Sequence, residues 1–274
     1  MPIVAMTYEA GSQCKEVARQ VAGELRLELV CHKAFEQHVA DKLHAAPNLV
    51  HHFLQGKPGL IERWKTDQSA LADYIAEEIY DLAARGNVLL HGWGATHLLR
   101  PVAHVLCVRV CAPIDHRIAV LMRELDIGGE AARARIAEND AARAITMRAL
   151  ASGEPDDACA YDLVLDTARM PVTECVAEIT RLVNEPILQE TAESRGRLHA
   201  LRREAQVRAA LRADAATSGV GPFVKVITDP HNGHIALEGA VQTYELKGNM
   251  ERVVAGLPWV SHVENRLHVV SPGG

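Results

Sequence analysis

Along the first 185 residues, short apolar runs alternate with segments whose apolar side chains recur at helical spacing. Five runs are predicted strands: residues 3–6, 27–30, 88–91, 105–110 and 161–167. Six segments are predicted helices: residues 15–25, 33–52, 69–84, 115–125, 131–150 and 171–184. Such alternation predicts an α/β fold, in which a parallel sheet is covered by helices on both faces.

The pattern changes after Pro186. Residues 191–216 are rich in Ala, Arg and Glu and predict a long, weakly apolar helix, which could be a connector or a dimerising arm. Small residues and a proline at 218–222 end this helix. We therefore expect three parts: an α/β domain at residues 1–185, a helical connector at 186–218 and a small α+β domain at 219–274.

Within the last part, polar and apolar residues alternate at 223–228 and 235–241. The turn His231-Asn232-Gly233 lies between these segments, so they predict a β-hairpin. A helix at 244–255 and two short strands are expected to follow. The two strands are predicted at residues 261–264 and 266–270.

Near the N-terminus, the first predicted strand leads through a turn of small residues directly into a helix. Such a corner presents backbone N–H groups and a helix N-terminus to phosphate. The turn is not an intact Gly-x-x-x-x-Gly-Lys-Ser/Thr loop, because Glu9 and Cys14 stand at its glycine positions and Glu16 at its hydroxyl position. A second candidate loop, Gly92-Trp93-Gly94-Ala95, follows another buried strand, at the sheet edge where open α/β folds bind ligands.

Composition narrows the classes of function. The chain of 274 residues has a formal net charge of -6, which argues against a surface that coats nucleic acid and favours a small anionic ligand bound by local arginines. Its six cysteines form no C-x-x-C pair, and neither a signal peptide nor an apolar run near membrane-spanning length is present. We therefore expect a reduced, cytoplasmic compartment and no membrane span.

Other catalytic and metal-binding motifs are missing from the sequence. It contains no H-E-x-x-H, no G-x-S-x-G and no G-x-G-x-x-G. The 14 histidines are scattered and are not spaced as a metal cage, so no site built from protein metal ligands is expected.

Four features, in chain order, resemble the cytidylate kinase-like family, a branch of the P-loop nucleoside monophosphate kinases. They are Glu9-x-Gly11-Ser12-x-x-x-Glu16, similar to a Glu-Tyr-Gly-Ser-Gly-Gly-Arg-Glu loop; Gly92-Trp93-Gly94-Ala95, similar to Gly-Arg-Gly-Ala; the lid motif Asp140-x-x-Arg143; and the final strand Leu163-Val164-Leu165-Asp166-Thr167. The resemblance covers residues 1 to about 185.

This resemblance implies transfer of the γ-phosphoryl group of ATP to a nucleoside monophosphate such as CMP, with Mg²⁺ required. The implied catalytic residues are Lys15, at the position of the loop lysine, and the lid arginines Arg143 and Arg148. The residues implied to bind nucleotide or phosphate are Gly11, Ser12, Gln13, Cys14, Lys15, Glu16, Gly92, Trp93, Gly94, Arg117 and Arg123.

Three departures from the family pattern leave a second hypothesis open. Gln13-Cys14 replaces two glycines, Trp93 replaces an arginine, and Glu16 offers no hydroxyl to Mg²⁺. The alternative is a catalytically inactive protein that senses a nucleotide or serves as a scaffold. Trp93 itself could stack on a base or fill the core beside its strand.

Residues 221–270 resemble a BON domain, through the pattern Ile235-x-Leu237-x-Gly239-x-Val241 and the later Val263-x-Asn265-x-Leu267-x-Val269. That family is associated with phospholipid, hydrophobic or small ligands. Because no export signal is apparent here, a small ligand or a protein partner is expected at this domain in place of lipid. A homodimer is a further possibility.

Overall fold

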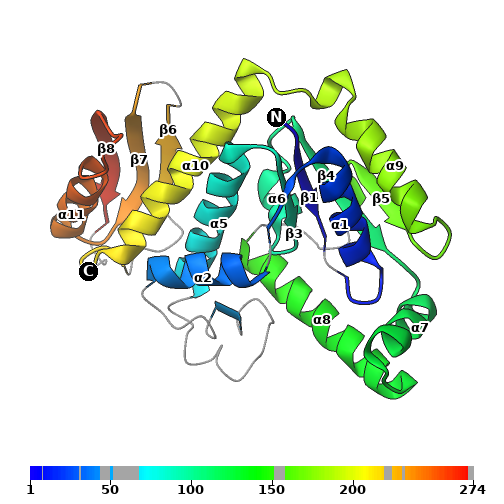
Figure 1. Cartoon of the computed structure of the whole chain (residues 1–274). Helices are drawn as coiled ribbons and strands as arrows, with labels where there is room; N and C mark the ends of the chain where they lie inside the picture. Colours follow the sequence, from blue (N-terminus) through cyan, green and yellow to red (C-terminus); the bar gives the residue numbers. More distant parts are fainter. Residues whose placement is uncertain are drawn as a thin grey trace.

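The computed structural model describes residues 1–7, 9–30, 32–43, 50–51, 68–150, 158–218, 224–229 and 232–270. Figure 1 shows an α/β body at the N-terminal end, a small sheet at the C-terminal end, and the helix α10 between them. Part of the helix predicted at 33–52 lies outside the described residues. Its described portions are α2 (His32–Leu43) and residues 50–51, which are also helical.

A five-stranded parallel sheet forms the α/β body, with strand order β2-β3-β1-β4-β5. Its strands are β1 (Ile3–Met6), β2 (Glu28–Leu29), β3 (Val88–His91), β4 (Val105–Cys111) and β5 (Leu163–Asp166). All four neighbouring pairs are parallel. The fold class predicted from the alternation of strand and helix is confirmed.

Helices cover both faces of this sheet, as the continuous apolar strands require. On one face, α1 (Cys14–Leu25) and α9 (Val172–Val183) pack against Val4 and Met6 of β1. On the other, α5 (Gln68–Arg85) and α6 (Ala95–Leu99) pack against Ile3 and Ala5. Alternate residues of β1 thus enter two separate cores.

The helices α7 (Ile114–Leu125) and α8 (Gly129–Leu150) pack against each other at one end of the body (Figure 1). A small apolar cluster, comprising Ala10, Leu121, Ala132 and Ile136, joins this pair to the loop after β1. The α7–α8 pair is therefore fixed to that loop by packing as well as by the polar contacts described below.

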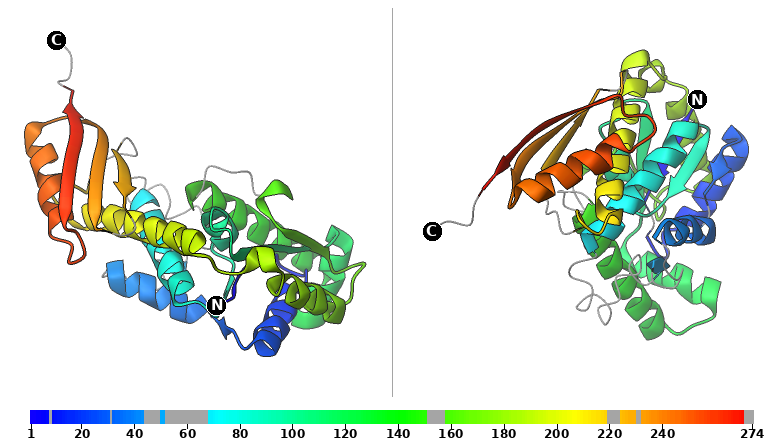
Figure 2. Two further views of the ribbon diagram at one scale, coloured as in Figure 1. Left: turned by 90° about the horizontal axis from the view of Figure 1, so that it is seen from above. Right: turned by 90° about the vertical axis from the view of Figure 1, so that its left-hand side faces the viewer.

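The long helix α10 (Ala192–Ala213) belongs to two cores. It begins with a capping box between Thr191 and Ser194. Leu198, Leu201, Ala205 and Ala209 join the core shared with α5, whereas Val207 and Leu211 join the core of the small sheet. Figure 2 shows α10 running between the two parts of the molecule.

Ion pairs strengthen the contact between α10 and α5. Arg202 pairs with Asp81, and Arg212 Nε lies 3.2 Å from Asp73 Oδ2. The helix therefore packs against both parts of the molecule. Its role as a connector or as a dimerising arm stays a prediction.

The small sheet contains β6 (Val224–Thr228), β7 (His234–Val241) and β8 (His262–Val269), in that order. β6 and β7 form the predicted antiparallel hairpin, and α11 (Tyr244–Ala255) leads to β8, which pairs with β7 in parallel. The prediction of two short strands at 261–264 and 266–270 was wrong. Asn265 continues the pairing, opposite Leu237, so one strand runs through both segments.

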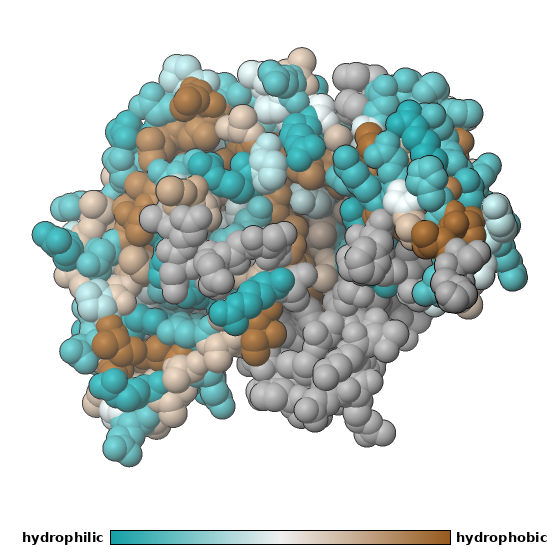
Figure 3. All heavy atoms as spheres, turned by 180° about the vertical axis from the view of Figure 1, so that it is seen from behind, coloured by the Kyte–Doolittle hydropathy of each residue, from teal (hydrophilic) through white to brown (hydrophobic). Residues whose placement is uncertain are grey.

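Among the described residues on the side shown in Figure 3, apolar patches are interspersed with polar side chains. Large exposed apolar residues are found at Ile114, Met122 and Leu125 of α7, among others. Among the described residues, no helix has the length and apolar character needed to cross a membrane.

Candidate nucleotide site

The loop between β1 and α1 has an unusual backbone. Gly11 has φ 78° and Gln13 has φ 56°, so both lie in the left-handed region. A Cβ at Gly11 would overlap the backbone carbonyl of Arg117, which explains why glycine is needed there. Gln13 adopts a conformation that favours glycine, and the strain costs about 1 kcal/mol.

Side chains inside this loop hold it together. Ser12 Oγ and Cys14 Sγ both donate to the carbonyl oxygen of Glu9, at 2.8 and 3.3 Å. Thr167 Oγ1 donates to the carbonyl oxygen of Ser12 at 3.0 Å, which ties the loop to the end of β5. Burial raises the pKa of the Cys14 thiol. The hydroxyl of Ser12, expected near donor phosphates, is therefore committed to the loop itself.

Backbone donors remain on this loop. The N–H groups of Gly11, Gln13 and Cys14 donate no hydrogen bond within the described part of the chain, whereas that of Ala10 donates to Asn139 Oδ1 at 3.0 Å. These donors precede or begin α1, whose N-terminus carries partial positive charge. Lys15 is exposed in the first turn of that helix. The loop therefore combines backbone donors, a helix N-terminus and a lysine, the groups that bind phosphate oxygens.

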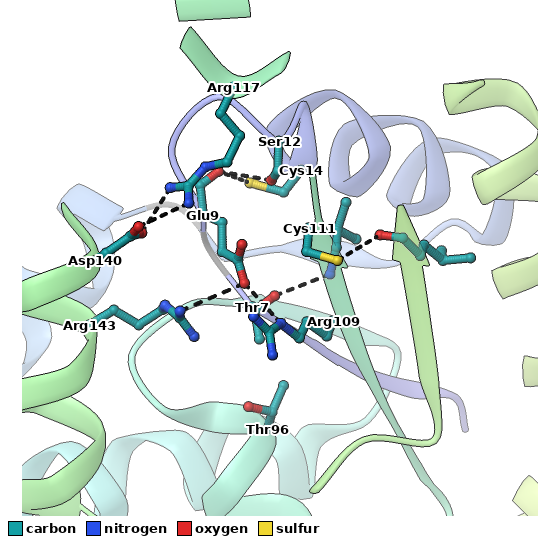
Figure 4. A network of polar contacts seen from close by, with 12 residues as sticks. Thr7, Glu9, Ser12, Cys14, Thr96, Arg109, Cys111, Arg117, Asp140 and Arg143 are labelled. Carbon is teal, nitrogen blue, oxygen red and sulfur yellow. Dashed lines mark hydrogen bonds and ion pairs between the residues drawn. The ribbon is translucent and has the colours of Figure 1, made fainter. Parts of the chain in front are cut away.

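A buried arginine joins the loop to the α7–α8 pair. Arg117 donates from Nε to the carbonyl oxygen of Ala10 at 2.8 Å and, from both Nη atoms, to the carboxylate of Asp140 at 2.8 and 2.9 Å (Figure 4). Arg117 was expected to bind phosphate. The structure instead has its guanidinium committed to a bidentate ion pair, which makes it a clamp between loop and helix.

A second group of charges surrounds Glu9. Arg109 Nε lies 3.0 Å from Glu9 Oε1, and Arg143 Nη2 lies 3.8 Å from the same oxygen. The three side chains come from the loop after β1, from β4 and from α8 and converge in Figure 4. Arg143 was expected at the site from its place in the lid motif, whereas Arg109 was not.

The remaining charged residues lie elsewhere. Arg123 and Arg148 are exposed on α7 and α8, and Arg123 Nε donates to the carbonyl oxygen of Ala119 at 3.3 Å. Glu16 accepts hydrogen bonds from Arg19 and Gln20 on the surface of α1, and that pairing lowers its pKa to about 2. The Glu16 carboxylate is therefore paired along the surface of α1 and is not directed toward the loop.

The loop after β3 is built differently from the loop after β1. Gly92, Trp93 and Gly94 all have positive φ, and Gly92 N donates to the carbonyl oxygen of Met6 at 2.8 Å. Trp93 is only 6% exposed and stacks on Phe35, with ring centroids 4.3 Å apart. Of the two interpretations of Trp93, the structure supports the core-filling one. Its ring is not presented to a base.

Sequence reasoning missed two partners at the site. Arg109 was not singled out, although a charge inside the apolar run at 105–110 is itself a signal. Asn139 stands next to the quoted Asp140 and carries no sequence signal of its own. Both act through contacts with residues more than 90 positions away.

Comparison with known proteins agrees with this geometry. Residues 3–169 match the family model described as "Cytidylate kinase-like family". The chain belongs to the cytidylate kinase-like family. The match covers the five strands, the loop after β1 and the α7–α8 pair, so the resemblance seen in the sequence is confirmed. Residues 201–271 match the model of the BON domain, which begins inside α10.

Individual relatives are distant. A protein named cytidylate kinase from Pyrobaculum calidifontis is 27% identical over 176 residues, which are 64% of this chain and 89% of that protein. A crystal structure of an uncharacterized protein from Eubacterium ventriosum has a TM-score of 0.53 and 15% identity, over 67% of this chain and 98% of that one. The structural likeness supports the fold alone.

Proposed function

We propose that this protein binds ATP at the loop after β1 and transfers the γ-phosphoryl group to a nucleoside monophosphate such as CMP. Membership in the cytidylate kinase-like family supports a nucleotide kinase-like protein. The observation that carries the proposal is the loop itself, in which Gly11, Gln13 and Cys14 keep their backbone N–H groups available in front of α1. Use of ATP would also suit the cytoplasmic location expected from the sequence.

In this proposal the protein positions the reactants and neutralises charge, and it forms no covalent intermediate. The backbone donors and the positive end of α1 would hold the donor phosphates, and Lys15 would add a charge at the β and γ oxygens. Arg143, on α8, would approach the phosphoryl group being transferred. Arg148 is exposed near the end of the same helix and would act only if that helix moved.

The residues present fit a triphosphate better than they fit a dedicated metal site. Among the described residues, no group of three or more His, Cys, Asp or Glu could hold a metal ion. Mg²⁺ in kinases takes few protein ligands and relies on phosphate oxygens and water, so this arrangement suits an ion that arrives with ATP. When bound, Mg²⁺ would neutralise charge between the β and γ phosphates.

A second candidate is nucleotide binding without transfer. Three observations favour it: Gln13 is strained where the family has glycine, Glu16 is paired on the helix surface, and Trp93 lies in the core where the family has an arginine. The BON domain would then supply the output, by binding a small ligand or a partner. In both candidates we assign residues 1–185 to the kinase-like domain, 186–218 to the connector and 219–274 to the BON domain.

One experiment separates the candidates. The full chain is titrated calorimetrically with ATP and with CMP, each with Mg²⁺, and the same samples are assayed for ADP formation. Acceptor-dependent ADP formation supports the kinase. Binding without turnover supports the nucleotide sensor, and the absence of binding by either nucleotide refutes both candidates.

A further inference from the structure

Two exposed histidines stand side by side at one end of the small sheet, where β7 and β8 are neighbours (Figure 1). Each is the first residue of its strand, and the parallel register pairs His234 of β7 with His262 of β8. Their ring centroids lie 5.4 Å apart. Ile235, the next residue of β7, is buried in the core that α10 and α11 share with the sheet. Because side chains alternate along a strand, both histidines lie on the face away from that core.

The backbone beneath this histidine pair is fixed by its own hydrogen bonds. Ser261 N donates to the carbonyl oxygen of Gly233 at 3.0 Å, and Ser261 Oγ donates to the carbonyl oxygen of Asn232 at 2.6 Å. His234 N donates to Asn232 Oδ1 at 3.0 Å. These bonds join the residues that directly precede the two histidines, so the starts of β7 and β8 are held in register. The two rings are therefore presented from a preorganised backbone.

The distance between the rings matches that of two imidazoles bound to one metal ion. Zinc binds imidazole nitrogen at about 2.0–2.1 Å in a tetrahedral arrangement, which places the centroids of two rings on one ion about 5 Å apart. The observed separation of 5.4 Å is close to this value, so rotation of the side chains brings one nitrogen of each ring to a shared ion without movement of the strands. The interplanar angle of 62° is compatible, because each ring can turn about its metal–nitrogen bond.

The pair would leave part of the coordination sphere of an ion open. Within the described part of the chain, neither ring forms a hydrogen bond. The carboxylate of Glu264, two residues along β8, pairs with Arg266 at 2.6 Å and is not counted as a ligand. Among the described residues, no third His, Cys, Asp or Glu completes the pair. An ion held by two imidazoles would therefore complete its shell with water or with donor atoms of an incoming ligand.

We propose that His234 and His262 form a two-histidine site for a divalent transition-metal ion such as Zn²⁺. Imidazole nitrogen suits zinc, copper and nickel, whereas Mg²⁺ prefers oxygen ligands, so the site is separate from any Mg²⁺ that arrives with ATP. It does not depend on the proposed phosphoryl transfer. The spacing of histidines along the chain did not predict it, because these two become neighbours only when β7 pairs with β8.

The test titrates the full chain with ZnCl₂ by calorimetry, in a buffer that does not bind zinc. His234→Asn and His262→Asn should each weaken zinc binding by about tenfold or more, because a single imidazole cannot chelate the ion. The double variant should lose little more than either single variant, as expected when both rings bind one ion. The matched control is His268→Asn, which removes an exposed histidine of β8 whose neighbour on β7 is Ala240.

Zinc affinities of the His234 and His262 variants within twofold of the control would overturn the proposal. So would the absence of zinc binding by the wild type, or losses that simply add in the double variant. NMR of the wild type guards against misfolded variants. During the zinc titration, the imidazole signals of His234 and His262 should shift together with one midpoint, and those of His268 should not. Separate midpoints for the two histidines, or no shift of either, refute the shared ion.

Discussion

Two loops at the same sheet edge, after β1 and after β3, differ in their chemistry. Each carries a side chain where the backbone has positive φ: Gln13 in the first and Trp93 in the second. The first loop keeps backbone donors in front of a helix and has charged side chains around it. The second places its side chain in the core, against Phe35. The same backbone strain therefore accompanies a loop that keeps backbone donors in one place and a loop that packs into the core in the other.

The largest effect should come from replacing Trp93, in the loop after β3, by the arginine of the family motif. Trp93→Arg should destabilise the fold by about 4 kcal/mol, because it removes a buried indole and places a charge in the core. Urea unfolding measures this. Trp93→Phe, which keeps an aromatic ring on Phe35, is the control, and equal stability of the two variants would contradict the core assignment.

The next effect concerns the first loop. Gly11→Ala adds a Cβ that overlaps the Arg117 carbonyl at positive φ, so unfolding should become easier by about 3 kcal/mol and ATP binding should be lost. Gly23→Ala is the matched control, since nothing lies within 4 Å of its new methyl group and helix propensity should make it neutral or stabilising. Wild-type stability of Gly11→Ala would show that the loop does not need its observed backbone.

A smaller effect should follow from breaking the ion pair by which Arg117 joins the loop after β1 to α8. Asp140→Asn leaves the buried Arg117 without its carboxylate, and the expected loss is about 2 kcal/mol, reduced from the value for a fully buried pair because Asp140 is about one-third exposed. Thermal unfolding measures it. Asp115→Asn, at an exposed and longer contact with Arg133, should change stability by less than about 0.5 kcal/mol. Equal losses would argue against a clamp.

The smallest effect should come from replacing Gln13, the strained residue of the loop after β1. Gln13→Gly relieves strain in the folded loop but frees the unfolded chain, so stability should change little. ATP should bind about threefold more tightly, because the backbone N–H groups lose a neighbouring side chain and reach the bound geometry at lower cost. Gln13→Ala keeps the Cβ and should show a smaller gain. Weaker binding by Gln13→Gly would indicate that the glutamine side chain itself contacts the ligand.

Local patterns in the sequence determined much of this protein. The apolar runs at residues 3–6 and 88–91 and the helical spacing between the runs fix strands, helices and their order, because side-chain periodicity is a property of neighbouring residues. The sequence alone also showed where the loop after β1 lies and that two of the family's glycines are missing from it. The family resemblance rested on these same short motifs.

Only the tertiary structure decided which side chains meet. Glu9 and Arg109 are separated by 100 positions, and no local pattern pairs them. Trp93 could face ligand or core until the placement of Phe35 decided it. Residue spacing predicted α10 but could not show that one helix serves two cores. The physical reason is common to all three: burial and charge compensation depend on neighbours in space, which the folded chain brings together from distant segments.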